Sequence, residues 1–301
     1  MRKIIGIGET ILDIIFKNGQ PTKALPGGSV FNTMVSLGRL GIPVHFITEL
    51  GQDQVGNNIL SFMRENNLST ENVDIFCEGK SPVSLAFLND QNEARYMFYT
   101  QYPENRLNVI WPRIDPDDIL ILGSYYAVNP SLRYRITEFL EYARERKAII
   151  YYDPNFRKAH AHEAMRITPS LLENFEYADI IRGSEEDFET LFNLSDPGKV
   201  YLDKIKFYCP NFIYTRGPKG VELFTAQTHL HFDVPQIKPV STIGAGDNFN
   251  AGLLYGILRE NISPEKWSDI ISSGIDFSLE VCNSYDNYIS TEFAAKYRTT
   301  H

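Results

Sequence analysis

The sequence predicts an α/β protein in which a mainly parallel central sheet is flanked by helices on both faces. Short apolar runs that suit buried strands alternate along the chain with segments whose apolar residues recur at helical spacing. One stretch, residues 82–100, interrupts this alternation with a two-residue period, which is typical of a half-buried β-hairpin. The chain shows no internal repeat, low-complexity tract or long linker, so we expect a single domain over residues 1–301.

The amino-terminal part of the chain begins the alternation. Apolar runs predict strands at residues 3–8, 10–16 and 44–48. Asn18 and Gly19 provide a turn after the second strand. Helical spacing predicts one helix with an apolar side from Phe31 to Leu40, directly after a pair of glycines, and another from Ile59 to Asn66.

The hairpin at residues 82–100 predicts a second, smaller sheet. Val83, Leu85 and Phe87 alternate before the polar turn at 89–93, and a second alternating run follows the turn. We expect this hairpin to join the early strands in a small antiparallel sheet. A small sheet beside a binding crevice is suited to act as a lid, formed by residues of about 10–24 and 77–104.

The rest of the chain returns to strands and helices in alternation. We expect buried strands at residues 119–122, 148–152, 179–182, 212–215 and 221–224. The helices between and after these strands are expected at 132–145, 185–192 and 247–259. Strand–helix alternation at this spacing favours parallel strands.

Composition excludes several classes of protein. The net charge of −9 and the lack of any dense run of Lys or Arg argue against a nucleic-acid partner. No apolar stretch approaches the roughly 18–20 residues of a membrane helix, so we expect no membrane contact. The three cysteines lie far apart and form no CxxC pair, which suits a reducing compartment and a cytoplasmic location.

The segment Ser241-Thr-Ile-Gly-Ala-Gly-Asp247 carries the strongest functional signal. Its glycines let consecutive backbone N–H groups point the same way, and the helix that follows adds its positive dipole end. Such a site favours an anion, yet Asp247 adds a carboxylate beside it. A base next to an anion site is what phosphoryl transfer to a hydroxyl requires. The segment alone would also suit a plain helix cap after a tight connection.

Several segments together resemble the PfkB (ribokinase-like) family of sugar kinases, most like fructokinases, over essentially the whole chain. The carboxy-terminal signature of that family is matched at Thr242, Gly244, Ala245, Gly246 and Asp247. The amino-terminal signature, a glycine pair before an Asn and a Gly-rich helix, is matched at Gly27, Gly28, Asn32, Gly38 and Gly41. Thr215–Gly220 is similar to the nucleotide-binding turn of the family.

The resemblance implies a ribokinase-like kinase domain and a set of site residues. Asp247 would be the general base, and the N–H groups of Gly244, Ala245 and Gly246 would hold the transferred phosphoryl group. The residues implied in sugar binding are Asp13, Gly27, Gly28, Asn32, Phe98 and Arg157. Those implied in nucleotide binding are Ser184, Asp187, Thr215, Gly217, Gly220 and Thr242.

The implied cofactors are ATP and Mg²⁺. The metal would bridge the nucleotide phosphates and reach Asp187 through water, without a direct protein ligand. Two departures from the family pattern concern this region. Ser241 replaces the first Asp of the carboxy-terminal signature, which leaves potassium dependence open, and the Asn-x-x-Glu motif appears as Ser184-Glu-Glu-Asp187.

The choice of sugar depends on two further segments. Asp153-Pro-Asn-Phe-Arg157 resembles a segment of fructokinases and 2-keto-3-deoxygluconate kinases. Keto-deoxygluconate kinases, and many fructokinases, carry an Arg directly after the aromatic residues of the hairpin, whereas the next Arg here is Arg106. A cation for a sugar carboxylate is therefore missing there, so we expect a neutral sugar, with fructose converted to fructose 6-phosphate. Ribose, a nucleoside and 2-keto-3-deoxygluconate stay open as alternatives.

Two alternatives of other classes are weaker. Gly6-Ile-Gly8 after the first strand suggests a dinucleotide-binding oxidoreductase, but Ile11 stands where the third glycine of that fingerprint belongs. The departures at Ser241 and Ser184 suggest a non-catalytic sugar-binding regulator on a kinase scaffold. The resemblance also leaves open a homodimer formed through the lid.

Overall fold

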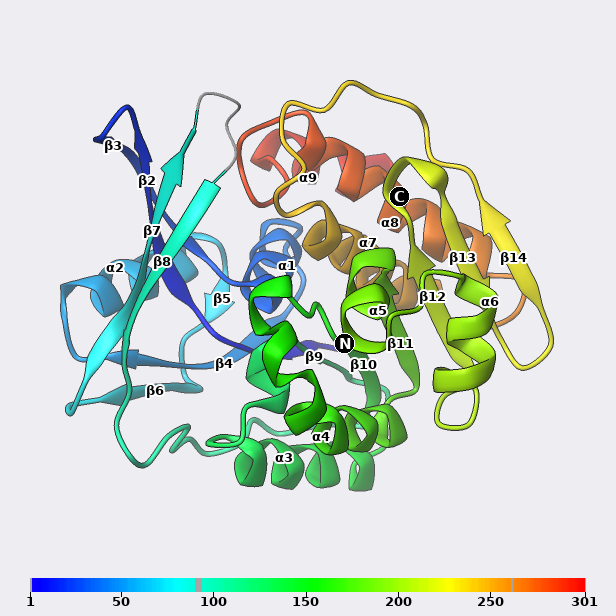
Figure 1. The fold of residues 1–301 in the computed structure, drawn as a ribbon, viewed down its shortest axis with the longest axis horizontal. Helices are drawn as coiled ribbons and strands as arrows, with labels where there is room; N and C mark the ends of the chain where they lie inside the picture. The colour runs from blue at the N-terminus through cyan, green and yellow to red at the C-terminus, as the bar shows by residue number, and fades with distance from the viewer. Residues whose placement is uncertain (1, 90–93, 261, 301) are drawn as a thin grey trace.

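The computed structural model describes residues 2–89, 94–260 and 262–300, and its strands form a large sheet and a separate small one (Figure 1). The large sheet has the strand order β14-β13-β12-β11-β10-β9-β1-β4-β5, with β6 paired to β4. Its pairings are parallel from β5 to β12, whereas β13 and β14 are antiparallel. The strands are β1 (Ile4–Ile7), β4 (Val44–Gly51), β5 (Leu68–Ser69), β6 (Val73–Phe76), β9 (Ile119–Gly123), β10 (Ile149–Asp153), β11 (Ile180–Ser184), β12 (Asn211–Thr215), β13 (Val221–Phe224) and β14 (His229–Phe232).

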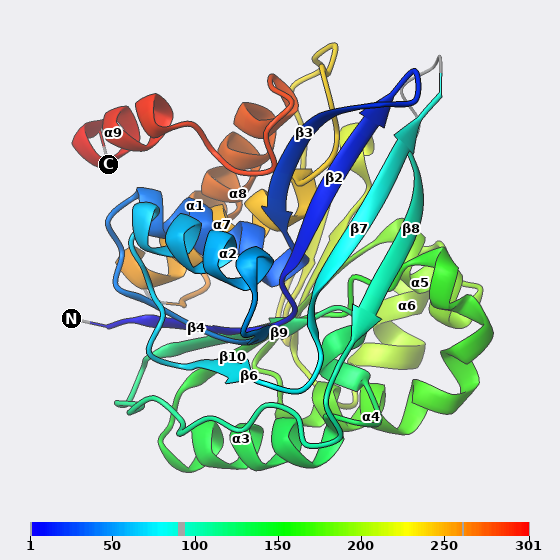
Figure 2. The same ribbon diagram turned by 90° about the vertical axis from the view of Figure 1, so that its left-hand side faces the viewer.

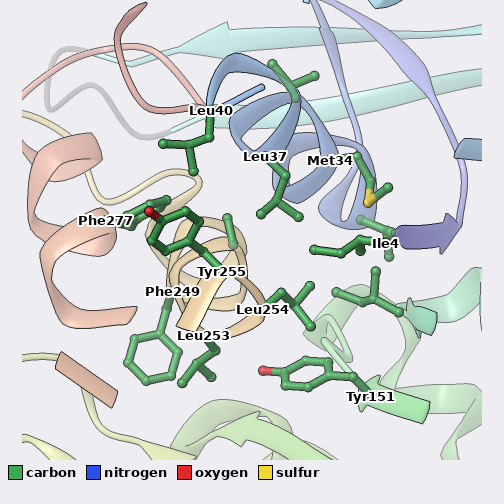
Figure 3. Packing of buried hydrophobic residues seen from close by; sticks show 14 of the residues in the cluster. Ile4, Met34, Leu37, Leu40, Tyr151, Phe249, Leu253, Leu254, Tyr255 and Phe277 are labelled. Atoms are coloured by element: carbon green, nitrogen blue, oxygen red, sulfur yellow. The ribbon is translucent and has the colours of Figure 1, made fainter. Parts of the chain in front are cut away.

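Helices cover both faces of the large sheet, which explains why its central strands are apolar throughout. Ile4 of β1 packs with α1 and α7 on one face, as Figure 3 shows for Met34, Leu37 and Leu254. Its neighbour Ile5 belongs to the core of the opposite face, against α3 and α4. The helices are α1 (Ser29–Arg39), α2 (Gln54–Glu65), α3 (Arg133–Glu145), α4 (Ala164–Tyr177), α5 (Glu185–Phe192), α6 (Pro197–Val200), α7 (Ala245–Glu260), α8 (Trp267–Cys282) and α9 (Thr291–Thr300).

The small sheet has the strand order β3-β2-β7-β8 and stands beside the large one (Figure 2). Its strands are β2 (Ile11–Lys17), β3 (Gln20–Gly27), β7 (Lys80–Leu88) and β8 (Ala94–Gln101). The β7–β8 hairpin is antiparallel, as predicted; β2 is antiparallel to β3, a strand that was not predicted, and the central pair β2–β7 is parallel. The two hairpins meet through their first strands, and both of these strands run away from the large sheet (Figure 2). Of the turn predicted at residues 89–93, only Asn89 lies among the described residues.

A side-chain cap explains where α2 begins, and a glycine turn explains where α7 begins. The sequence placed the start of α2 at Ile59, but the helix starts at Gln54 because Asp53 caps it. Oδ1 of Asp53 accepts from Gly56 N at 2.8 Å, and Oδ2 accepts from Ser81 N at 2.8 Å, which ties α2 to β7. Helix α7 starts at Ala245, directly after Gly244, whose φ of 78° ends the extended segment before it.

Helix α7 is held close to α8 by glycines. A Cβ on Gly252 would lie 2.2 Å from the carbonyl oxygen of Ser273, and one on Gly256 would lie 2.9 Å from the Cα of Ile270. Only glycine allows this approach, so α8 fixes the direction in which the first turn of α7 points. None of the helices among the described residues has both the length and the apolar character needed to cross a bilayer.

Candidate active site

Asp247 lies in the first turn of α7, where the first turn of α1 meets it. The side chain of Ser29 donates to Oδ1 of Asp247 at 2.9 Å, and that of Asn32 donates to Oδ2 at 2.8 Å. Asp247 is only 6% exposed, so its carboxylate is buried. Its neighbours are polar groups rather than core side chains. The two amino-terminal helix ends therefore share one buried carboxylate.

Polar residues on the buried side of α1 fix this junction. Thr33 Oγ1 donates to the backbone oxygen of Asp247 at 2.8 Å, and Ser36 Oγ donates to Oδ1 of Asn248. Asn248 Nδ2 in turn donates to the backbone oxygens of Gly244 and Asn287, both at 2.8 Å. These buried hydrogen bonds hold the glycine segment and the start of α7 in one arrangement.

Burial raises the pKa of Asp247 above its ordinary value. The hydrogen bond from Asn32, the charge of Arg157 and the hydrogen bond from Ser29 oppose this shift, because each stabilises the ionised form. The balance leaves a raised pKa, which makes the carboxylate a stronger proton acceptor than an exposed Asp.

The glycine segment before Asp247 supplies backbone amides. Gly244 has a φ of 78°, and a Cβ there would lie 2.7 Å from the backbone oxygen of Asn287. The N–H groups of the first turn of a helix have no partner within the helix, so those of α7 are suited to an anion. The N–H of Ala245 donates to the oxygen of Thr242 at 3.3 Å, so this amide already has a partner within the protein.

Arg182 of β11 lies beneath this segment, and the sequence analysis did not single it out. A Cβ on Gly246 would lie 3.2 Å from Nη2 of Arg182. The guanidinium is buried and pairs with Asp153 at 3.0 Å (Nη1 to Oδ2), while Nη2 donates to Thr215 Oγ1 at 2.8 Å. Asn250 of α7 also donates to Oδ2 of Asp153, at 2.6 Å. One buried cation thus connects the ends of β10 and β12 with the start of α7.

The predicted sugar-binding residues at the amino-terminal end come together around the glycine pair. A Cβ on Gly27 would lie 2.7 Å from Oδ2 of Asp13, and one on Gly28, at φ 138°, would lie 2.3 Å from the oxygen of Glu9. Ser84 donates to Oδ1 of Asp13, and burial raises the pKa of Asp13. The glycines therefore let β2 approach the start of α1, where Asn32 contacts Asp247.

Phe98 and Arg157 approach the same region from other elements. Asp13 pairs in register with Ser84, and Ser84 pairs with Phe98, so these three side chains share one face of the small sheet. Phe98 is 63% exposed on that face. Arg157 is exposed, and its charge acts on Asp247. Two residues before it, Asn155 donates to Ser29 Oγ and, at 3.5 Å, to Oδ1 of Asp247.

The predicted nucleotide-binding residues line the neighbouring strand ends. Ser184 and Thr215 are register partners at the ends of β11 and β12. Gly217 and Gly220 have φ values of 52° and 104°, which glycine adopts easily in the turn before β13. Thr242 is exposed, two residues before Gly244.

Asp187 has a structural role that the sequence did not predict. Its Oδ1 accepts from the backbone N–H of Phe156 at 2.7 Å, and its Oδ2 accepts from the backbone N and the Oγ of Ser184, both at 2.6 Å. Asp187 therefore completes the capping box of α5, whose N-cap is Ser184, and holds the segment that carries Arg157. Burial, together with the charge of Asp153, raises its pKa. Its predicted place near magnesium stays a prediction.

The arrangement predicts that Arg182 is needed to hold the site together. Replacing it by Met would leave Asp153 buried without its cation, and we expect a loss of about 3–5 kcal/mol in the free energy of unfolding. Arg182→Lys keeps the charge and should lose less. Urea unfolding followed by circular dichroism measures the stability of both variants. Arg113→Met is the control, because it removes an exposed ion pair, the one between Arg113 and Asp115. Equal stability of Arg182→Met and wild type would contradict the assignment.

Comparisons with known proteins show the family to which the chain belongs. A model described as pfkB family carbohydrate kinase matches residues 1–278. A probable chloroplastic fructokinase-6 of Arabidopsis thaliana is 26% identical over 273 residues, which cover 85% of this chain and 70% of that protein. A fructokinase of Rhizobium leguminosarum bv. trifolii is 25% identical over 266 residues, with 86% and 81% covered.

Solved structures show the same fold. Aminoimidazole riboside kinase from Salmonella enterica, complexed with aminoimidazole riboside and an ATP analogue, has a TM-score of 0.84 at 21% identity, covering 99% of each chain. Fructokinase from Vibrio cholerae O395, in its fructose, ADP and calcium bound form, has a TM-score of 0.85 at 19% identity, covering 97% of this chain and 96% of that one. The predicted α/β fold with its separate small sheet is confirmed.

Proposed function

The chain belongs to the pfkB family of carbohydrate kinases, and we propose that it transfers the γ-phosphoryl group of ATP to a hydroxyl of a neutral sugar, with fructose as the expected substrate. Family membership confirms the prediction of a phosphotransferase with an alcohol group as acceptor. The observation that carries the proposal is the position of Asp247, a carboxylate of raised pKa in the same helical turn as the backbone amide of Gly246.

The proposed reaction follows from this geometry. The hydroxyl oxygen attacks the γ-phosphorus while its proton passes to a carboxylate oxygen of Asp247, and the bond to the ADP oxygen breaks. The amides of Gly244 and Gly246 stabilise the charge on the transferring group. Bound ATP and Mg²⁺ supply the phosphoryl group and neutralise the phosphate charge. Both oxygens of Asp187 already accept protein hydrogen bonds, which fits a water-mediated place beside magnesium.

The state of Arg106 supports a neutral sugar. Its guanidinium pairs with Glu49, with both side chains buried, and stacks 3.6 Å from the ring centre of Tyr102. Tyr126 also donates to Glu49, at 3.3 Å. Arg106 is thus already paired within the protein and does not replace the missing cation for a sugar carboxylate. The names of the similar plant and bacterial proteins favour fructose among neutral sugars.

The small sheet is proposed to close over the sugar as a lid, from residues of about 10–24 and 77–104. Asp13 and Phe98 lie on one face of it and would contact the sugar from that side. Closure would exclude water and so limit the hydrolysis of ATP in place of transfer.

A panel of sugars identifies the substrate. We expect ADP release from ATP and Mg²⁺ with fructose, detected by a coupled assay, and little release with 2-keto-3-deoxygluconate, because the Arg that follows the hairpin aromatics in kinases of that sugar acid is missing here. Ribose and a nucleoside complete the panel. Strong turnover of the sugar acid with no turnover of fructose would contradict the neutral-sugar proposal.

Replacing Asp247 by Asn tests the base. The amide cannot take a proton, so we expect kcat to fall by roughly 10²–10⁴, the usual contribution of a positioned base. ATP binding, measured by calorimetry, should be retained, because Asn keeps the shape of the side chain. Turnover close to wild type would show that the proton leaves by another route.

The raised pKa of Asp247 predicts the acid limb of the pH profile. The ionised carboxylate is the active form, so kcat should be lost as the pH falls through this pKa, at a higher pH than for an ordinary Asp. Ser29→Ala removes a bond to the ionised form and should move the limb to still higher pH.

Thr33→Val is the matched control for that shift. Thr33 donates only to backbone oxygens, including that of Asp247, so its loss should leave the limb in place. If the acid limb of the kcat profile shifts equally in Ser29→Ala and Thr33→Val, or in neither variant, the limb does not report the pKa of Asp247.

We further propose that the chain forms a homodimer through the small sheet. Its face opposite Asp13 carries Phe16, Phe87 and Met97; the first two rings stack at 4.9 Å, and Phe87 and Met97 are 37% and 47% exposed. An exposed apolar sheet face of this kind suits a second copy of itself. Sedimentation should show a dimer that Met97→Asp converts to a monomer. A wild-type monomer at high protein concentration would contradict it.

A further inference from the structure

Glu9 is a carboxylate for which neither the sequence nor the proposed reaction supplies a role. It lies between β1, a central strand of the large sheet, and β2 of the small sheet. Its backbone oxygen packs against Gly28, where a Cβ would come within 2.3 Å. Glu9 therefore stands at the carboxyl end of a parallel strand and beside the start of α1. Ligands of open α/β sheets bind at such strand ends.

Two of the four charges that act on Glu9 come from residues proposed to hold the sugar, Asp13 and Arg157. The other two belong to Arg106 and Glu49. Asp13 comes from the small sheet, and Arg157 follows β10 and also acts on Asp247. The Glu9 side chain is nevertheless exposed. Its place at the end of β1 and beside Gly28, the residue before α1, puts Glu9 next to the residues proposed to bind the sugar.

Within the part of the chain that the structure describes, no hydrogen bond or ion pair satisfies the Glu9 carboxylate. Arg106, the cation with the largest effect on Glu9, is paired with Glu49, which also accepts from the backbone N–H of Leu107 at 3.2 Å. Crowding by protein atoms raises the pKa of Glu9, with the charge of Asp13 adding to the effect. A carboxylate left in this state has unused acceptor capacity beside the proposed sugar.

The charge balance of this region disfavours an anionic acceptor. Glu9, Asp13 and Asp247 are three carboxyl groups, and Arg157 is the exposed cation that acts among them. Hydrogen bonds from hydroxyl or ammonium groups to a carboxylate are charge-assisted and strong. A carboxylate on the substrate at the same place would meet like charge, which is strongly unfavourable.

We propose that Glu9 is a further substrate-binding residue, which accepts a hydrogen bond from a hydroxyl or ammonium group of the sugar and excludes sugar acids. The proposal deepens the proposed kinase function and rests on it for the position of the sugar. It makes Glu9 a specificity residue and gives it no part in proton transfer. The acceptor class is therefore polyhydroxy sugars that are neutral or carry an amino group.

Glu9→Gln tests this role because the amide keeps the shape and removes the charge. With fructose as the probe, we expect KM to rise by roughly 10-fold, the loss of one charge-assisted bond, while kcat and the KM for ATP stay within about twofold. The preference for fructose over gluconate, measured as the ratio of kcat/KM values, should fall by a similar factor. Glu71→Gln, an exposed carboxylate between β5 and β6, is the matched control and should match wild type.

Calorimetric binding of fructose and gluconate to the same variants separates this inference from the proposed function. If Glu9→Gln binds fructose more weakly than the wild type, the role of Glu9 in sugar binding is supported. If the wild type also binds fructose without phosphorylating it, the kinase proposal is contradicted while the role of Glu9 stands. An unchanged fructose affinity and KM in Glu9→Gln would overturn the inference, as would binding of gluconate in preference to fructose by the wild type. Failure of the wild type to bind any neutral sugar would overturn it as well.

Discussion

The buried ion pair between Arg182 and Asp153 is the interaction on which the arrangement of the site depends. Burying two charges costs free energy that their attraction alone does not offset, so further hydrogen bonds are needed. Thr215 supplies one to Arg182, and Asn250 supplies one to Asp153. These partners belong to separate elements, so the pair fixes the ends of β10 and β12 relative to α7. The guanidinium keeps its charge at any working pH, which makes this connection permanent.

The same logic explains the carboxylate between α1 and α7. Burial alone would favour a neutral Asp247, whereas Ser29, Asn32 and the nearby Arg157 favour the ion. Two amino-terminal helix ends meet there, and their dipoles also favour negative charge. A base that is buried, bonded and adjacent to free amides can act on a hydroxyl without reorganising, which is the condition for efficient phosphoryl transfer.

The sequence predicted the parts of the fold that depend on local pattern. Seven strands of the large sheet (β1, β4 and β9–β13) and helices α1, α3, α5 and α7 follow from apolar spacing, and the family and fold are confirmed. Helices α4, α6, α8 and α9 and strands β3, β5, β6 and β14 were not predicted. Pro169 interrupts the pattern of α4, and β5 has only two residues. The parallel β2–β7 pair joins segments far apart in the chain, so no local pattern encodes it.

For the site, the glycine signatures indicated the residues near Asp247, while Arg182 was missed because one Arg within an apolar strand forms no motif. Its role appears only when β10, β12 and α7 meet. A crystal structure with fructose and a non-hydrolysable ATP analogue tests most directly whether Asp247 and the neighbouring amides form the catalytic site. We predict an acceptor hydroxyl within hydrogen-bond distance of Asp247 and the γ-phosphate at the amides of Gly244 and Gly246. Fructose bound away from Asp247, or phosphates away from those amides, would contradict the account.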